Sequence, residues 1–143
     1  MNTGIVICLE QLSKVYACAE QLYADSASCA SSPVLTQFYI ERAIERMDFI
    51  DEISCKIEND NSYNGRTYEE LFDWHKMLYG PGLLGQPSFV GIDALTVDEK
   101  ALEICGYITP IKLREDIVNL LENQVLRIKS GILAWQFLNR LYD

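Results

Sequence analysis

Apolar residues recur every three to four positions over most of this chain, and this spacing limits its possible folds more than any other feature. Near the amino terminus the steps alternate between four and three residues, which places the side chains along one side of a helix. The residues of this first seam are Ile5, Leu9, Leu12, Tyr16, Ala19 and Tyr23. Strand-like alternation with β-branched residues occurs nowhere in the sequence. The pattern therefore predicts a protein built only from helices.

A second helix is predicted to begin at Ser32 and Pro33, because serine is a favoured N-cap and proline a favoured first helical residue. The small and polar residues 25–32 before it are expected to form the turn. The predicted helix runs to about Glu58. Its expected apolar seam comprises Ile40, Ala43, Met47, Ile50 and Ile57, with Ile44 and Ile53 beside them. A short connector between two helices of similar length predicts an antiparallel αα-hairpin.

The middle of the chain departs from this regular pattern. Turn-forming residues 59–65 end the second helix. Thr67 and Glu70 then form a capping box, which predicts a short helix that stops at Gly80 and Pro81. The glycine- and proline-rich residues 80–93 predict a loop.

Two more helices are predicted in the last third of the chain. A second capping box, Thr96 and Glu99, predicts a helix that Gly106 ends. Thr109 and Pro110 are expected to begin the longest helix, which continues to Leu141. Its apolar seam comprises Ile111, Val118, Leu121, Val125, Ile128, Ile132 and Trp135. The predicted fold is an all-α, antiparallel up-down four-helix bundle over residues 1–143, with an extra short helix and loop between helices 2 and 3.

Size and charge narrow the possible partners. A chain of 143 residues is long enough to bury the core of a single domain. Its net charge of −9 would repel nucleic acid and anionic membrane surfaces. No segment approaches the roughly 20 apolar residues of a membrane span, and no basic stretch precedes the first apolar run. We therefore expect a cytoplasmic protein that binds neither nucleic acid nor membrane.

The five cysteines are odd in number and widely spaced, without any CxxC pair. Such spacing argues against a disulfide framework and against a zinc site, so reduced thiols are expected. Cys8 and Cys105 lie beside apolar positions and are predicted to be small buried hydrophobes. Cys29, in the polar connector, is predicted to be exposed.

The hairpin half of the sequence resembles a known superfamily. The positions that carry the resemblance are Leu9, Tyr16 and Tyr23, then Ser32 and Pro33, and then Phe38, Ala43, Arg46, Phe49, Ile50 and Glu52. With this pattern the chain resembles the ferritin-like superfamily, and within it a bacterial family of unknown function. The segment from Trp74 to Leu78 corresponds to a short helix of that family, whereas residues 80–93 have no counterpart. The resemblance implies an antiparallel four-helix bundle that often assembles further, and it implies no reaction.

Metal chemistry of the ferritin type requires Glu-x-x-His motifs that point into the bundle. His75 is the only histidine, and Phe72 stands three residues before it, so this motif is absent. Most carboxylates lie off the apolar seams and are expected to form a solvated face. Those that border the seams are Glu20, Asp51, Glu103 and Glu122. We predict no metal ligand and no cofactor.

A cysteine nucleophile paired with His75 is the remaining catalytic possibility. Nothing in the spacing marks any cysteine as its partner, and His75 on a short aromatic helix is expected to be a packing or surface residue. We therefore predict no catalytic residue.

Aromatic residues gather in the irregular middle segment. They either plug the end of the bundle or form a surface for a partner protein, since exposed aromatic side chains anchor interfaces. The residues of this possible interaction surface are Tyr68, Phe72, Trp74, His75, Tyr79 and Phe89, with Tyr63 beside them. Gly131, inside the last helix, would permit another helix to approach closely.

The leading functional hypothesis is a metal-free ferritin-like bundle that acts as a protein-interaction or structural protein. A homodimer joined through the last helix or the aromatic segment is expected. The alternative is a carboxylate-bridged, metal-binding oxidase or iron-handling protein of the ferritin-like type. A thiol enzyme that uses His75 is the third possibility.

Overall fold

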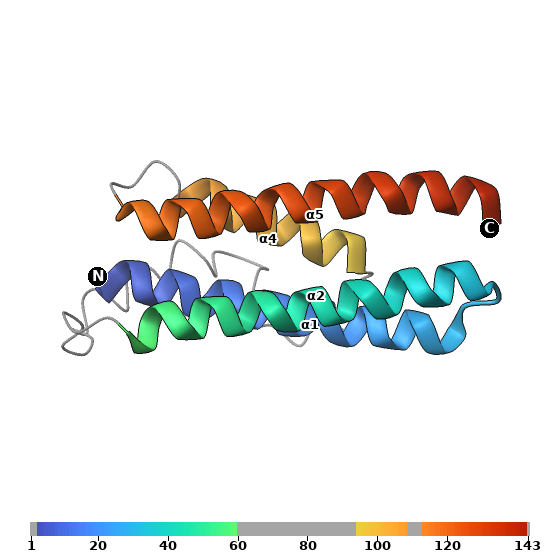
Figure 1. Cartoon of the computed structure of the whole chain (residues 1–143), viewed down its shortest axis with the longest axis horizontal. Coiled ribbons are helices and arrows are strands. Elements are labelled where there is room, and N and C mark those ends of the chain that lie inside the picture. The colour runs from blue at the N-terminus through green and yellow to red at the C-terminus, as the bar shows by residue number, and fades with distance from the viewer. Residues whose placement is uncertain (1–2, 60–93, 109–112, 143) are drawn as a thin grey trace, which may run out of the picture.

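The computed structural model describes residues 3–59, 94–108 and 113–142, and these residues form four helices and no strand (Figure 1). The helices are α1 (Thr3–Cys29), α2 (Pro33–Glu58), α4 (Ala94–Ile108) and α5 (Glu115–Tyr142). The all-α class predicted from the apolar spacing is confirmed. The short helix predicted after Thr67 lies outside the described residues.

Helix α1 continues beyond the predicted end, through most of the polar segment that was expected to turn. Ala24 and Ala27 favour helix, and the side chain of Gln21 bonds that of Asp25 one turn later at 3.0 Å. The hydroxyl of Ser28 donates to the carbonyl of Ala24, so this serine is also accommodated in the helix. The predicted turn over residues 25–32 is wrong, and only residues 30–32 connect α1 to α2.

Helix α2 begins as predicted. The hydroxyl of Ser32 accepts a hydrogen bond from the backbone N–H of Val34, and Pro33 occupies the first turn. Part of the predicted seam is wrong, because Ile40, Ile44 and Met47 are 40–54% exposed. Ala43 and Ile53 are buried as expected. The helix carries two apolar faces, and the face with the two large phenyl rings is the one that packs inward. The residues buried along α2 are Leu35, Phe38, Ala43, Arg46, Phe49 and Ile53.

The predicted starts of the last two helices are also corrected. Helix α4 begins at Ala94, so Thr96 lies within it and does not cap it. Gly106 does not end α4, which continues to Ile108. Helix α5 begins at Glu115 and not at Pro110, with Glu115 and Asp116 placed favourably for the helix dipole in its first turn.

The four helices surround one core, and each helix runs antiparallel to both of its neighbours (Figure 1). Contacts between distant residues fix these directions. Tyr23, near the end of α1, meets Asp98 at the start of α4, and Lys56, near the end of α2, meets Asp116 at the start of α5. Consecutive helices α2 and α4 therefore run in the same direction, so the predicted up-down alternation is interrupted between them.

Because the described helices differ in length, part of α5 extends beyond α4. Helix α4 has 15 residues, whereas α5 has 28. The C-terminal part of α5 therefore extends past the start of α4, with α2 as its remaining partner (Figure 1). None of the described helices is both long enough and apolar enough to cross a membrane.

Gly106 in α4 and Gly131 in α5 provide a matched test of the helix assignments. A methyl group at Gly106 would meet no atom within 4 Å, whereas one at Gly131 would lie 3.3 Å from Cδ of Arg42. We expect Gly106→Ala to stabilise the protein by about 0.5–1 kcal/mol, because alanine is the better helix former. Gly131→Ala should stabilise less, since Arg42 must move. Chemical denaturation measures both, and a destabilised Gly106→Ala variant would contradict the continuation of α4 through this position.

Candidate functional site: a buried ion-pair network

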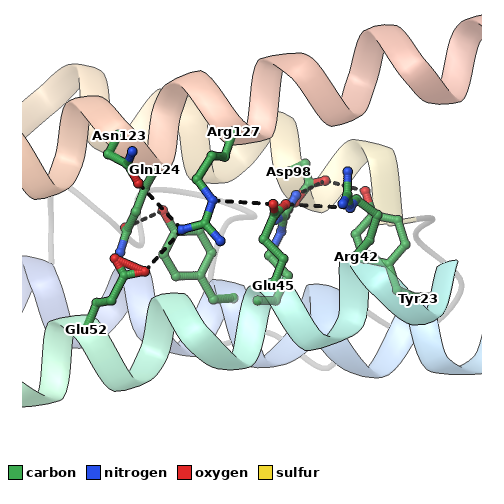
Figure 2. A network of polar contacts seen from close by, with 10 residues as sticks. Tyr23, Arg42, Glu45, Glu52, Asp98, Asn123, Gln124 and Arg127 are labelled. Atoms are coloured by element: carbon green, nitrogen blue, oxygen red, sulfur yellow. Dashed lines mark hydrogen bonds and ion pairs between the residues drawn. The ribbon is translucent and has the colours of Figure 1, made fainter. Parts of the chain in front are cut away.

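Arg46 of α2 lies at the centre of the bundle with none of its surface exposed. Its Nε and Nη2 atoms each donate to one carboxylate oxygen of Asp98 on α4, both at 2.9 Å. The side chain of Asp98 is 1% exposed. This two-bonded arrangement is the most directional ion pair that an arginine can form, and here it joins α2 to α4 without access to water. Figure 2 shows Asp98 with Tyr23 and Glu45 around it.

Tyr23 brings α1 into the same cluster. Its hydroxyl donates to Oδ2 of Asp98, which already accepts from Arg46. The guanidinium of Arg46 also lies over two aromatic rings, 5.6 Å from the centroid of Tyr23 and 5.0 Å from that of Phe49. Hydrogen bonds and ring faces together replace much of the water that this buried charge would have in solution.

A second arginine connects the cluster to α5. Glu45 accepts from Nη1 of Arg46 at 2.7 Å and faces Nε of Arg127 at 3.4 Å. Arg127 also reaches Glu52 at 3.3 Å, and its guanidinium lies 4.6 Å from the ring centroid of Phe49 (Figure 2). The network therefore runs from the buried centre to the partly exposed surface between α2 and α5, and it includes at least one residue of every described helix.

Gln124 of α5 makes a separate buried link. Its amide oxygen accepts from the hydroxyl of Tyr16 at 2.9 Å, and its amide nitrogen donates to the backbone carbonyl of Phe49 at 3.3 Å. A fully buried amide is costly unless both of its ends are bonded, and here both are. Gln124 therefore fixes the position of α5 against α1 and α2.

The electrostatic environment keeps these groups in one protonation state. Burial alone would lower the pKa of Arg46, but the hydrogen bonds and charge of Asp98 raise it above its usual value. Burial, followed by the negative charge of Asp98, raises the pKa of Tyr23. Burial likewise raises the pKa of Tyr16. None of these groups offers a proton-transfer site near neutral pH, and Asp98 has its oxygens occupied from within the protein.

Two of the cysteines are also interior groups, as predicted from their apolar surroundings. Burial raises the pKa of Cys8 to about 12 and that of Cys105 to about 11. Both thiols therefore remain protonated and are shielded from reagents. Cys29 is exposed, as predicted, and so is Cys55. Among the described residues, no three His, Cys, Asp or Glu side chains gather in a way that could hold a metal ion.

The residues predicted from sequence to carry function are not brought together. Tyr68, Phe72, Trp74, His75, Tyr79 and Phe89 lie outside the described residues. Of the carboxylates that border the seams, Asp51, Glu103 and Glu122 are exposed and Glu20 is half-buried. Sequence reasoning missed Asp98 entirely. One signal was available, since Arg46 lies three residues before Phe49 on the same helical face and would need a buried acidic partner.

Hollows within the described part of the chain are shallow or small. A groove of about 400 Å³ runs between α1 and α2, beside Ile40, Ile44 and Met47, and Glu20 is the one charged residue among those that line it. A smaller cavity of about 110 Å³ lies near Tyr23, Tyr39 and Trp135, at the start of α4. The indole N–H of Trp135 donates to the hydroxyl of Tyr39 at 3.3 Å beside that cavity.

Comparison with known proteins adds no relative to this description. No protein-family model, no curated protein and no solved structure matches the chain.

The Asp98 carboxylate can be tested by removal. We expect Asp98→Ala to destabilise the fold by about 3–5 kcal/mol, because the buried Arg46 would lose both of its bonds to Asp98 and keep only Glu45 as an ionic partner. The double variant Arg46→Met/Asp98→Leu should lose much less, since no charge remains inside. Arg127→Ala, at the partly exposed end of the network, should cost about 1 kcal/mol or less. Denaturation by urea compares the four proteins, and equal losses from Asp98→Ala and Arg127→Ala would contradict the buried pairing.

Thiol chemistry tests the burial of the cysteines. In the native protein we expect an aromatic disulfide reagent to modify Cys29 and Cys55 rapidly, whereas Cys8 and Cys105 should react only after unfolding. Well below pH 9 the thiols of Cys8 and Cys105 are neutral in both the folded and the unfolded chain. As pH rises above 9, the unfolded chain loses these protons first, so stability should decline until the raised pKa values are passed. Peptide mapping after timed modification identifies the sites, and rapid native labelling of Cys8 would refute the assignment.

Proposed function

We propose that this protein is a ferritin-like helical bundle that acts through protein–protein contacts and uses no metal. The main observation that supports this proposal is the placement of the large exposed apolar side chains, which form rows on the outer faces of two helices. Ile40, Ile44 and Met47 form the row on α2. The row on α5 consists of Leu126, Leu133, Phe137 and Leu141. Aligned apolar side chains of this kind are typical of binding surfaces, whereas single exposed ones are not.

The closed interior supports the same proposal. A catalytic or metal site needs polar groups that point into a space a substrate or ion can enter. The polar groups at the centre of the bundle are bonded to one another, as Asp98 is to Arg46 and Tyr23. Among the described side chains, the atoms that are buried without a hydrogen bond are Oε1 of Gln11 and Nε of Arg42. The exposed carboxylates, including Asp51 and Glu122, point away from that interior. This arrangement favours an interaction role over the carboxylate-bridged metal enzyme.

The order of helix directions supports the ferritin-like part of the proposal. Helices α1 and α5 run one way, and α2 and α4 run the other way (Figure 1). A bundle acquires this order when a single long connection crosses between its second and third helices, as in ferritin-like folds. The order agrees with the resemblance of the hairpin half to that superfamily.

Charge indicates which kind of partner the α2 row would accept. The exposed carboxylates of Glu41 and Asp48 lie on the same outer side of α2, and Glu20 lines the groove from α1. A protein segment with apolar side chains flanked by lysine or arginine would be complementary to this surface. We therefore propose a basic amphipathic segment of another protein as the occupant of the α2 row.

Photo-crosslinking tests the interaction role. A benzophenone amino acid in place of Ile44 should yield a discrete adduct in the native cell, whereas the same group in place of the exposed Glu99 on α4 should not. Sequencing of the crosslinked peptide should find apolar and basic residues. Addition of Asp48→Lys should reduce the adduct, because it reverses one of the flanking charges. Equal labelling from both positions would contradict the proposal.

Metal analysis tests the alternative function, a carboxylate-bridged metal protein. After exposure to Fe²⁺ and Mn²⁺ and then gel filtration, the full-length protein should retain far less than one metal ion per chain. Retention of one or two ions per chain that is lost on substitution of Glu20 or Glu122 would instead favour the carboxylate-bridged metal protein.

A further inference from the structure

The outer face of α5 carries an apolar stripe that no described helix covers. Leu133 and Phe137 are 67% and 64% exposed, and Leu126 and Leu141 are exposed to a similar degree. Their spacing of seven, four and four residues aligns them on one side of the helix. Ile128, which is fully buried, lies two residues from Leu126 and therefore about half a turn away. The stripe thus points directly away from the bundle core.

We propose that this stripe pairs two copies of the chain, with α5 antiparallel to α5 of the second copy. The proposal rests on the protein-interaction function and specifies one of its surfaces. The stripe has the three-and-four spacing of a coiled-coil seam once the exposed Ser130 is included. In a two-fold arrangement the same stripe serves both copies, so the surface must be complementary to itself.

One antiparallel register satisfies this requirement. When Ser130 lies opposite Leu133 of the second copy, Leu126 lies opposite its Phe137, and the two-fold axis repeats both layers. Leu126 then contacts Phe137 of the second copy, and the small Ser130 lies beside its Leu133. Leu126, Leu133 and Phe137 each acquire a partner without any change in the bundle itself, whereas Leu141 lies at the end of the interface, opposite residue 122 of the second copy.

Charge complementarity selects this antiparallel register. Glu122 and Arg140 are both exposed, and they lie five full turns apart, so they flank the stripe on the same edge. Within the described part of the chain neither has an ion-pair partner. The register that aligns Leu126 with Phe137 of the second copy places Glu122 next to its Arg140, twice per dimer. A parallel pairing would instead direct Glu122 towards Arg127, which Glu45 and Glu52 already hold.

The size of the stripe limits the strength of the dimer. Four apolar side chains from a single helix cover less than the roughly 800 Å² per partner of a standard stable interface. We therefore expect association at micromolar concentrations, visible as a reversible monomer–dimer equilibrium.

Sedimentation equilibrium of the full chain tests the surface. Leu133→Asp should raise the dissociation constant about 100-fold or more, because it places a charge in the centre of the interface. Ile44→Asp is the matched control, since Ile44 is an equally large aliphatic residue, 54% exposed, on the other apolar row. It should leave the dimer intact. Circular dichroism melts confirm that both variants remain folded, as expected for exposed positions.

Charge reversal tests the register. Glu122→Arg and Arg140→Glu should each weaken the dimer about tenfold, and the double variant Glu122→Arg/Arg140→Glu should restore it. A parallel dimer would be insensitive to Arg140→Glu, and that result would overturn the antiparallel register. A wild-type chain that stays monomeric to near-millimolar concentration, or a dimer that Ile44→Asp disrupts and Leu133→Asp does not, would overturn the α5 surface. A monomeric chain leaves the crosslinking test of the α2 row unaffected, whereas a dimer that Ile44→Asp disrupts would place the second copy on that row, so the failures of the two proposals can be told apart.

Discussion

The buried pairing of Arg46 with Asp98 constrains the rest of the structure. A guanidinium and a carboxylate without water are stable only if nearly every donor and acceptor finds a partner. This requirement sets how α1, α2 and α4 meet, because Tyr23, Arg46 and Asp98 come from three different helices. Apolar packing alone tolerates rotation of a helix about its axis, whereas a two-bonded ion pair does not. The pair therefore accounts for the face of α2 that turns inward.

Much of the fold could be predicted from sequence, and the failures have a common physical origin. Apolar spacing located all four described helices, and the Ser32 and Pro33 signal placed the start of α2 correctly. Spacing could not decide between the two apolar faces of α2. The spacing predicts that Met47 faces the core, but Arg46 and Phe49 occupy the interior instead, because a charged side chain looks like a surface residue until its partner is known. That partner, Asp98, is 52 residues away in sequence.

The candidate site could be predicted even less well. The apolar neighbours of Cys8 and of Cys105 predict that both thiols are buried, because a local apolar environment is visible in the sequence. The carboxylates that border the predicted seams include Glu20, Asp51 and Glu122. The carboxylate that enters the core is instead Asp98, which the sequence pattern does not single out. The two ends of α4 also differ from the prediction. Thr96 and Gly106 carry capping signals, but the packing of α4 overrides both of them. Propensity is a weak constraint where a helix lies in a well-packed core.

The interior and the exterior of this bundle thus have separate roles. Inside, the side chains of Tyr23, Arg46 and Asp98 bond to one another and hold the helices in place. Outside, the apolar residues that the core does not need stand in rows on α2 and α5, with Glu41 and Glu122 among the charges that flank them. The proposed interaction role requires this division between a rigid centre and an exposed binding surface. The most direct test is the exchange rate of the Arg46 Nε–H with solvent, measured by NMR against that of the exposed Arg140. We predict that the Arg46 proton exchanges only through global unfolding. Exchange as fast as that of Arg140 would contradict the buried ion pair and the fold organised around it.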